Sequence, residues 1–530
     1  MKVIAAILVD LDESPLGTKS RLAEPLCGVP ILRRTIERAM KCELPASLHV
    51  VCPGPQRDRV TELLSGLDVR IECHDAPPAP YQSLVRGGRF WGLDSWRGGA
   101  GAFCAFDEDF HSAVLDALAR KMEAEAVAVI PAAAPLFDPG ILDAMIRHAR
   151  GAEEQTGVTF VQAPPGLGAF IIRRHILEQI AQSAIPPGAI LAYQPATPMA
   201  DLTGRDTCYR PSVDIIHARG RLLCDTRRST ERVRRFIESG AEREDAAAIG
   251  RRLIRESGER IDEMPEEIEI ELTTDLPAGW TPVLRPMGGD TPRRGPISMA
   301  AIESIAASLH GHDDVRIVLG GFGEPMLHPE FADICRIFRA AGAMAVAVRT
   351  SGLVESDDFD RAIFETPVQL VETMLDAATA ATYRRVHGID AYEKASAILE
   401  RRLERRVKEN RVLPIWVPSL VKAEETFDDL EAFVDSWQRR LGMYAVTGYS
   451  QCAGQRPDHA VSRMAPPERT ACRRVFSRML VLADGSVTTC DQDYRGVQTV
   501  GRVPDSSLVD IWRTAAPLTS IRLNIVGDAP

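Results

Sequence analysis

The stretch that decides the fold runs from Val315 to Phe331 and reads VRIVLGGFGEPMLHPEF. It opens with a β-branched run, which predicts a strand buried on both faces. Three glycines then let the backbone turn sharply and approach a ligand, because no Cβ atom stands in the way. Open α/β sheets bind ligands at such turns, at the carboxyl ends of parallel strands. We therefore expect cofactor-binding residues at Gly320, Gly321, Gly323 and Glu324.

Two residues of this stretch have simpler interpretations that stay open. Glu324 could cap the neighbouring helix N-terminus instead of binding a ligand. His328 precedes a proline at a helix start, and a histidine in that position more often caps or packs than catalyses.

Composition describes a multidomain globular chain. Its 530 residues exceed what one hydrophobic core supports, so we expect roughly two to four domains. The net charge of 63 − 74 = −11 argues against a general nucleic-acid binder. No apolar run approaches about 18 residues, which predicts no transmembrane helix. The N-terminal residues MKVIAAILVDLDES are expected to form a first strand and not a signal peptide.

The cysteines indicate a reducing compartment. The chain has eleven of them, none spaced as CxxC or CxxxC. An odd number without such pairs suits a cytoplasmic protein better than a disulfide framework. We expect most of them to be small buried apolar residues.

Strands and helices alternate over the first third of the chain, residues 1–239, which predicts a doubly wound α/β sheet. Three segments carry a resemblance here: LGTKSRLAEPLCGVP from Leu16, AVAVIPAAAPLFDPGILDAMI from Ala126, and LLCDTRRSTERVRRFIE from Leu222. Together they resemble the cytidylyltransferase type of nucleotidyltransferase. In that family the early loop cradles a nucleotide triphosphate and two aspartates hold Mg²⁺.

The resemblance implies cofactor-binding roles for Arg21 in the early loop and for Asp225, the second metal aspartate. The first metal aspartate corresponds to an alanine of the run Ala132–Ala134, and Glu24 lies where a lysine is expected. One carboxylate binds Mg²⁺ weakly, so we expect the fold to be kept and the transferase chemistry to be lost. The alternatives are a solvated loop residue for Arg21 and a helix N-cap for Asp225.

A glycine- and arginine-rich stretch, residues 86–103, carries Trp91 and Trp96. It is interpreted either as a clamp for an anion or a base, or as a packed loop. The charged, alanine-rich residues 240–264 predict a helical linker with solvated faces.

Six βα repeats follow over residues 265–450, which predicts an incomplete parallel (βα)₆ barrel. One helix is expected over TYRRVHGIDAYEKASAILERRLERR, which starts at Thr382. The repeats resemble the radical S-adenosylmethionine core on three motifs. These are the Gly320–Glu324 turn, RTSG at Arg349–Gly352, and the strand end and helix of Glu372–Gly388.

The resemblance stops at the motif that carries the radical chemistry. That family holds a 4Fe–4S cluster with three cysteines, CxxxCxxC, on the loop after the first strand. The corresponding loop here, Asp275–Met299, contains no cysteine and no histidine. We therefore expect no radical-SAM cluster and no radical cleavage of S-adenosylmethionine.

The last segment, residues 451–530, contains MLVLADGSVTTC, which predicts a hairpin with Asp484-Gly485 as its turn. With Cys472, Cys490 and the later GRV and SLVDIW motifs, it resembles the SPASM extension of radical S-adenosylmethionine proteins. The resemblance implies metal ligation by Cys472 and Cys490 and a possible 4Fe–4S cluster. Only these two ligands are present, with Cys452 as a third candidate at a position that is not the family's.

The combination resembles the spiro-SPASM proteins. We expect a non-radical accessory protein that binds S-adenosylmethionine, a nucleotide or nucleotide-sugar, or a protein or peptide partner, with no role for nucleic acid or membrane. Two alternatives stay open: a nucleotidyl- or glycosyl-type transferase acting through the first domain, and an iron–sulfur protein acting through the SPASM segment.

Overall fold

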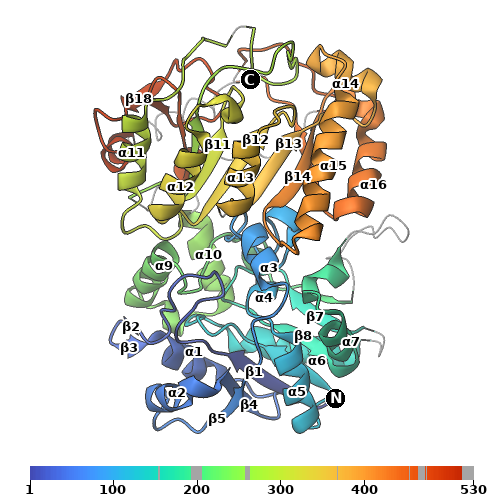
Figure 1. The fold of residues 1–530 in the computed structure, drawn as a ribbon. Helices are drawn as coiled ribbons and strands as arrows, with labels where there is room; N and C mark the ends of the chain where they lie inside the picture. The colour runs from blue at the N-terminus through green and yellow to red at the C-terminus, as the bar shows by residue number, and fades with distance from the viewer. Residues whose placement is uncertain are drawn as a thin grey trace. The chain divides into compact units, whose positions relative to one another are not determined.

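We describe a computed structural model of the 530-residue chain. The described residues are 1–152, 156–192, 206–256, 263–289, 291–366, 368–452, 454–462, 472 and 474–515. The chain divides into two compact units, Met1–Ser257 and Gly258–Pro530. Figure 1 shows the fold, and each unit is described by itself below.

The first unit is built on one seven-stranded sheet with the strand order β5-β4-β1-β6-β8-β7-β9. β1 pairs in parallel with β4 and β6, and β8 runs antiparallel to both of its neighbours. The strands are β1 Val3–Leu8, β4 Leu48–Pro53, β5 Arg70–His74, β6 Ala126–Val129, β7 Val158–Val161, β8 Phe170–Arg173 and β9 Cys208–Tyr209. A short hairpin adds β2 Pro25–Leu26 and β3 Val29–Pro30. The predicted doubly wound α/β fold is confirmed.

Helices connect these strands, and their apolar sides pack on the sheet. Central β1 is buried from Val3 to Ile7 because it has covered neighbours on both sides. The α-helices are α1 Ile31–Ala39, α2 Arg57–Leu63, α3 Gln82–Arg89, α4 Ala105–Glu108, α5 Ser112–Lys121, α6 Pro139–Gly151, α7 Arg174–Ser183, α8 Val213–Ile216, α9 Arg227–Glu238 and α10 Ala246–Glu256. Short 3₁₀ turns are η1 Gly54–Gln56, η2 Ala100–Ala102, η3 Pro187–Leu191 and η4 Ala241–Arg243.

The helix predicted within residues 240–264 is α10. It packs against the first unit, because Ile249 and Leu253 are buried in that unit's core. Residues 257–262 lie outside the described part of the chain.

The second unit has one nine-stranded sheet with the order β15-β14-β13-β12-β11-β10-β16-β17-β18. Six parallel strands follow chain order: β10 Glu267–Glu271, β11 Arg316–Gly320, β12 Ala345–Thr350, β13 Leu370–Met374, β14 Ile415–Lys422 and β15 Ala445–Gly448. The predicted incomplete (βα)₆ architecture is therefore confirmed. The remaining strands are β16 Arg478–Val481, β17 Ser486–Thr488 and β18 Thr499–Arg502.

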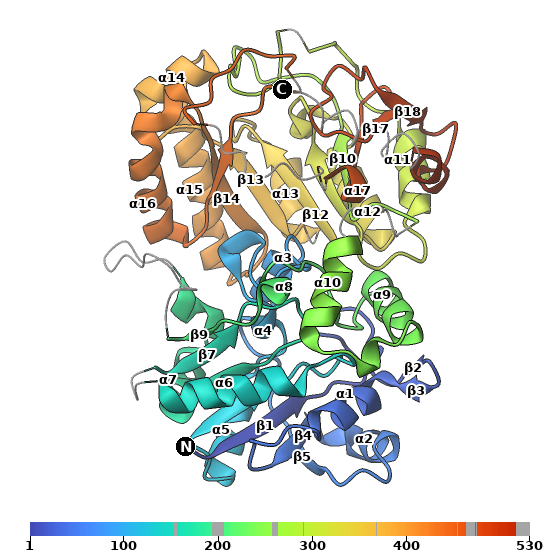
Figure 2. The ribbon, with the colours of Figure 1, turned by 180° about the vertical axis from the view of Figure 1, so that it is seen from behind.

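The helices of the second unit cover one face of its parallel strands. α12, α13 and α15 lie in front of the strands in Figure 1, and the strands lie in front of them in the reverse view of Figure 2. The α-helices are α11 Met299–Ser308, α12 Phe331–Ala340, α13 Asp357–Glu365, α14 Ala380–His387, α15 Tyr392–Lys408, α16 Leu430–Leu441 and α17 Arg474–Ser477. Two 3₁₀ turns are η5 Pro325–Leu327 and η6 Glu424–Asp429.

One helix prediction was wrong. The single helix expected from Thr382 is two helices, α14 and α15, separated at Gly388. Gly388 has φ +71°, and a Cβ atom there would lie 2.1 Å from Oγ1 of Thr281. The chain must turn at this glycine because the loop after β10 packs against it.

The hairpin predicted at Asp484-Gly485 is confirmed. β16 and β17 pair antiparallel across this turn, and Gly485 has the positive φ of +86° that the turn requires. β16 also pairs in parallel with β10, so the hairpin continues the sheet of the barrel strands.

Candidate functional site

A cavity of about 310 Å³ opens in the first unit at the carboxyl ends of the strands. Asp10 follows β1, Pro53 and His74 end β4 and β5, and Ala132 follows β6. The chain leaves β1 toward β4 on one side, while β6 lies on the other. Ligands of doubly wound sheets bind at this kind of reversal in strand order.

Both arginines at the cavity are held by carboxylates. Arg21, a predicted cofactor-binding residue, lines the cavity and pairs with Glu24 at 3.1 Å. Arg86, which the sequence did not single out, donates from Nε to the Pro15 carbonyl oxygen at 2.7 Å and pairs with Glu13. The cavity therefore offers two oriented guanidinium groups.

Asp225, the other predicted residue of this unit, lies in the same cavity wall but is committed to a buried ion pair. Its Oδ1 accepts from Nε of Arg221 at 2.8 Å, and Nη2 of Arg221 also donates to Oε2 of Glu108 at 2.6 Å. Burial raises the pKa of Asp225 although Arg221 opposes the shift. The N-cap alternative for Asp225 was wrong, because Thr226 caps α9 by accepting from the Ser229 amide.

The residues present do not fit the Mg²⁺ that the nucleotidyltransferase resemblance implies. Ala132 and Ala133 line the cavity beside Asp225 and supply no carboxylate. The guanidinium of Arg221 already neutralises Asp225, and a second cation beside it would be repelled. We derive no step through a metal ion at this position.

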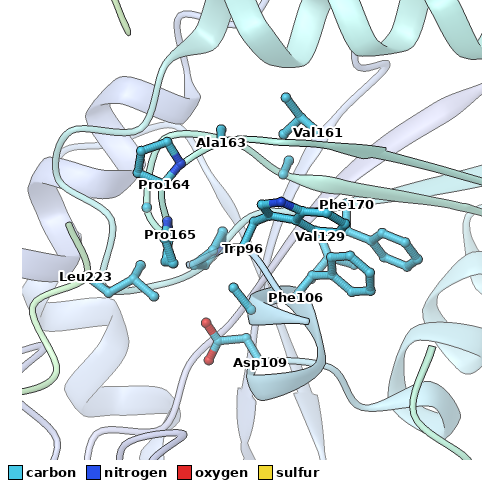
Figure 3. Close-up of a pocket in the computed structure, with 15 residues that line it drawn as sticks. Trp96, Phe106, Asp109, Val129, Val161, Ala163, Pro164, Pro165, Phe170 and Leu223 are labelled. Carbon is cyan, nitrogen blue, oxygen red and sulfur yellow. The ribbon is translucent and has the colours of Figure 1, made fainter. Parts of the chain in front are cut away.

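Asp109 lies between this cavity and a smaller aromatic pocket of about 40 Å³ (Figure 3). Trp96, Phe106 and Phe170 line that pocket. Phe106 stacks on Phe170 with ring centres 4.1 Å apart, and Trp96 stacks on Phe160, which lies outside the lining, at 5.1 Å. Trp96 is therefore packed within the fold, as the packed-loop interpretation of residues 86–103 predicts. Its ring also lines the pocket.

Asp109 is a half-buried carboxyl group without a counter-ion in the part of the chain that the structure describes. Among the described residues its side chain has no hydrogen bond or ion pair. Burial, and then the neighbouring charges of Glu108 and Asp225, raise the pKa of Asp109 to about 8. At neutral pH Asp109 is therefore a neutral hydrogen-bond donor at the junction of a polar and an aromatic pocket.

In the second unit, internal packing accounts for the glycines of the Gly320–Glu324 turn. Gly321 has φ +73°, and a Cβ atom there would lie 2.5 Å from Cβ of Glu271 at the end of β10. A Cβ atom on Gly323 would lie 2.1 Å from the Thr273 carbonyl oxygen. Gly320 is less crowded, with Cβ of Arg349 at 3.3 Å. The ligand role of these glycines remains a prediction.

Glu324 is fully buried and bonded within the fold. Its Oε2 accepts from the amide and the hydroxyl of Ser351 at 2.8 and 2.7 Å, and its Oε1 accepts from the Met326 amide. The bond from the Met326 amide makes Glu324 the N-cap of the turn η5. The capping interpretation of Glu324 is therefore confirmed. His328 packs: it is buried, with Nε2 3.0 Å from the Ile297 carbonyl oxygen.

The cysteine-free loop after β10 places two arginines among the carboxylates at the strand ends. Arg285 binds Asp376 with both arms of its guanidinium, at 2.8 and 2.9 Å. Arg294 binds both oxygens of Glu271, at 2.5 and 3.0 Å, and also the Tyr494 carbonyl oxygen. Burial opposes ionisation of Asp376, but Arg285 outweighs it and holds the pKa of that carboxyl below its usual value.

These side chains do not fit the iron–sulfur cluster that the barrel resemblance implies. Arginine guanidinium groups are cations without a free lone pair, whereas the cluster needs thiolates. Arg349 of β12 completes the same interior network, binding Glu269 at 2.6 Å and Glu372 at 3.0 Å.

The two cysteines of the SPASM segment lie near each other. Cys472 is exposed and Cys490 is half-buried. Burial raises the pKa of Cys490, and the charges of Asp491 and Cys472 add to the shift. Cys452 is buried, with Asp491 among its charged neighbours. Within the described ranges no three His, Cys, Asp or Glu side chains are arranged to hold a metal ion.

Several residues of these networks were missed by the sequence analysis, above all Arg86, Asp109, Arg221, Arg285 and Arg294. One signal was available for Arg285 and Arg294: the loop after β10 contains no cysteine but several arginines. Arg86 and Arg221 were missed because they pair with Glu13 and Glu108, which lie far along the chain.

One family model matches a segment at the end of the chain. Residues 472–528 match the SPASM family, an iron-sulfur cluster-binding domain. An uncharacterised protein of Treponema pallidum (strain Nichols) is 28% identical over 207 residues, which are 37% of this chain and 57% of that protein. The chain therefore matches little more than half the length of this relative.

The similar solved structures include SuiB and anSMEcpe as well as a cytidylyltransferase. SuiB of Streptococcus suis bound to precursor peptide SuiA has 12% identity and a TM-score of 0.38, over 54% of this chain and 77% of that one. The enzyme anSMEcpe with bound AdoMet has 12% identity and a TM-score of 0.37, over 48% and 82%. A cytidylyltransferase of Leptospira borgpetersenii serovar Hardjo-bovis has 15% identity and a TM-score of 0.33, over 48% and 94%. At these values we draw nothing about function from the three likenesses.

Within the described ranges, no helix combines the length and apolar character that crossing a bilayer requires.

Proposed function

We propose that this chain is a non-radical accessory protein that binds a small ligand in the cavity of its first unit. The observation that carries the proposal is the position of that cavity, at the carboxyl ends of β1, β4, β5 and β6 where the strand order reverses. Its volume of about 310 Å³ falls in the range of small-molecule sites.

The ligand class we propose is a nucleotide or a nucleotide-sugar. Arg21 and Arg86 supply oriented guanidinium groups for a phosphate. Asp109 supplies a neutral donor beside aromatic rings that suit an uncharged ring of the ligand. Binding needs no metal here, because Arg221 already compensates Asp225.

The non-radical part of the proposal rests on the loop after β10. It has no cysteine, and its arginines Arg285 and Arg294 are bonded to strand-end carboxylates. We propose that these ion pairs stabilise the barrel as a scaffold, and that the accessory role is played toward a protein or peptide partner in the cytoplasm.

Titration calorimetry of the full chain tests the binding proposal. The ligands are a cytidine nucleotide, a nucleotide-sugar and S-adenosylmethionine, each without added metal. We expect a nucleotide ligand to bind, and we expect Arg21→Ala to weaken it about tenfold through loss of a charge-assisted bond. Arg33→Ala is the matched control, since Arg33 pairs with Glu37 outside the cavity. Binding of none of the three ligands would sink the small-ligand proposal.

A second candidate function is iron–sulfur binding by the SPASM segment. The match of residues 472–528 favours it, together with the neighbouring thiols of Cys472 and Cys490. Two thiolates are half of the usual four-cysteine ligand set, so we propose that a partner protein completes it.

Anaerobic reconstitution followed by iron and sulfide counts tests this second candidate. We expect retained iron to fall in Cys472→Ser and Cys490→Ser and to stay unchanged in Cys27→Ser, a matched exposed cysteine of the first unit. The same iron content in all four proteins would contradict the assignment.

A further inference from the structure

Two cysteines face each other on neighbouring strands of the first unit. Cys52 of β4 and Cys73 of β5 are register partners in a parallel ladder. Such partners point to the same face of the sheet, on strands about 4.8 Å apart. A disulfide needs Cα atoms about 4.4–6.8 Å apart, so the pairing satisfies its first geometric condition.

The two cysteines also differ in exposure. The neighbouring Cys73 contributes to the pKa shift of Cys52, as expected for register partners. Cys52 is fully buried, whereas Cys73 is exposed on β5, the edge strand of the sheet. A reagent from solution therefore reaches Cys73 first and finds Cys52 directly behind it.

A cation lies beside the exposed sulfur. Nη1 of Arg57, the first residue of α2, is 3.5 Å from Sγ of Cys73. This contact fixes the position of the sulfur that a reagent from solution reaches first. Burial, followed by the neighbouring Cys73, raises the pKa of Cys52 to about 12, so Cys52 is not the thiol that reacts first.

We propose that Cys52 and Cys73 form a thiol–disulfide exchange site whose substrate is a low-molecular-weight disulfide such as oxidised glutathione. The Cys73 thiolate attacks one sulfur of the substrate, the substrate S–S bond breaks, and one thiol leaves with a proton. The Cys52 thiol then loses its proton and attacks Cys73 Sγ, which releases the second thiol. Two protein thiols are oxidised to one disulfide and one substrate disulfide is reduced to two thiols.

The position of the pair connects it to the cavity. Pro53 and His74, the residues directly after the two cysteines, line the cavity of about 310 Å³. The disulfide would tie the ends of β4 and β5 together at that wall. Thiol–disulfide exchange at Cys52 and Cys73 does not require a ligand in the cavity. A negative result for ligand binding would therefore leave the exchange proposal standing, and the reverse also holds.

The first test treats the native full chain with oxidised glutathione, quenches with acid and maps the peptides by mass spectrometry. We expect a Cys52–Cys73 linked peptide, and at early times glutathione on Cys73 that disappears as the link forms. Cys27, exposed in the same unit, is the internal control and should keep a stable adduct that forms at least about fivefold more slowly. Stable glutathione on Cys73, or equal rates at Cys73 and Cys27, would overturn the proposal.

The second test uses Cys52→Ala. We expect the glutathione adduct on Cys73 to persist in this variant as it does on Cys27, and a thiol reductant to remove both. Disappearance of the Cys73 adduct in Cys52→Ala would show that another thiol resolves it and would contradict the pairing. The wild-type time course needs no variant, so the proposal stays testable if Cys52→Ala does not fold.

Discussion

In each unit an arginine neutralises a buried carboxylate. Arg221 does so for Asp225 in the first unit, and Arg285 does so for Asp376 in the second. A buried carboxylate without a cation is costly, so each arginine stabilises the fold by compensating the charge of its carboxylate.

Arg285→Ala should therefore destabilise the second unit. The substitution leaves the fully buried Asp376 without its bidentate partner, and we expect a loss of about 3–5 kcal/mol in the free energy of unfolding. Urea denaturation measures it. Arg439→Ala, which removes an exposed pair with Asp435, should cost about 0.5 kcal/mol or less. Equal losses would show that Arg285 adds no more than a surface ion pair.

Asp109 makes the stability of the first unit depend on pH. Its folded pKa of about 8 lies above the unfolded value near 3.8, so the folded state keeps a proton that the unfolded state has lost. Stability should fall as pH rises from about 4 to about 8 and stay level above that.

Asp109→Asn should remove this dependence and raise stability at pH 9 by about 1–3 kcal/mol, as measured by denaturation at several pH values. Asp68→Asn, a change of an exposed carboxylate, is the control and should keep the wild-type slope. An unchanged slope in Asp109→Asn would show that another group carries the effect.

At the scale of single elements, the Gly320–Glu324 turn has two possible explanations that a substitution separates. Close packing on β10 explains Gly321, because its Cβ atom would overlap Glu271. Gly321→Ala should cost about 2–4 kcal/mol in unfolding free energy. Gly342→Ala is the matched control: φ is +90° there with nothing within 4 Å, so only about 1 kcal/mol should be lost. A loss of only about 1 kcal/mol in unfolding free energy in both variants would indicate that ligand binding, and not packing, requires glycine at position 321.

At the scale of the whole molecule, the barrel strands and the SPASM hairpin of the second unit share one large core. The same apolar cluster contains Ile268 of β10, Leu480 of β16 and Trp512 near the end of the described chain. Arg294 and Glu271 add polar connections, because Glu271 also accepts from the Ala483 amide at 3.0 Å. The barrel strands and the SPASM hairpin should therefore unfold together.

Hydrogen exchange followed by mass spectrometry tests this cooperativity. Amides of β16 should show the same protection as those of β10, since one sheet and one core stabilise both. Early exchange of β16–β18 while β10 stays protected would show that the hairpin is an independent module.

Repeating patterns made much of the architecture predictable. Alternating apolar strands and amphipathic helices, the turn at Asp484-Gly485 and the six βα repeats all have local signatures, and these predictions were confirmed. The break at Gly388 was missed because its cause, Thr281, lies about a hundred residues earlier in the chain. A clash between distant segments leaves no periodic trace in either of them.

The amino-acid sequence alone determined the α/β class, the βα order and the absence of cysteine from the loop after β10, because these depend on residue type and short-range spacing. Only the tertiary structure decided which charges meet. Arg221 with Glu108, Arg285 with Asp376, and Cys52 with Cys73 are contacts between segments that only the sheet topology and strand register bring together. Charge and thiol chemistry depend on distances of a few ångströms, and the fold sets those distances.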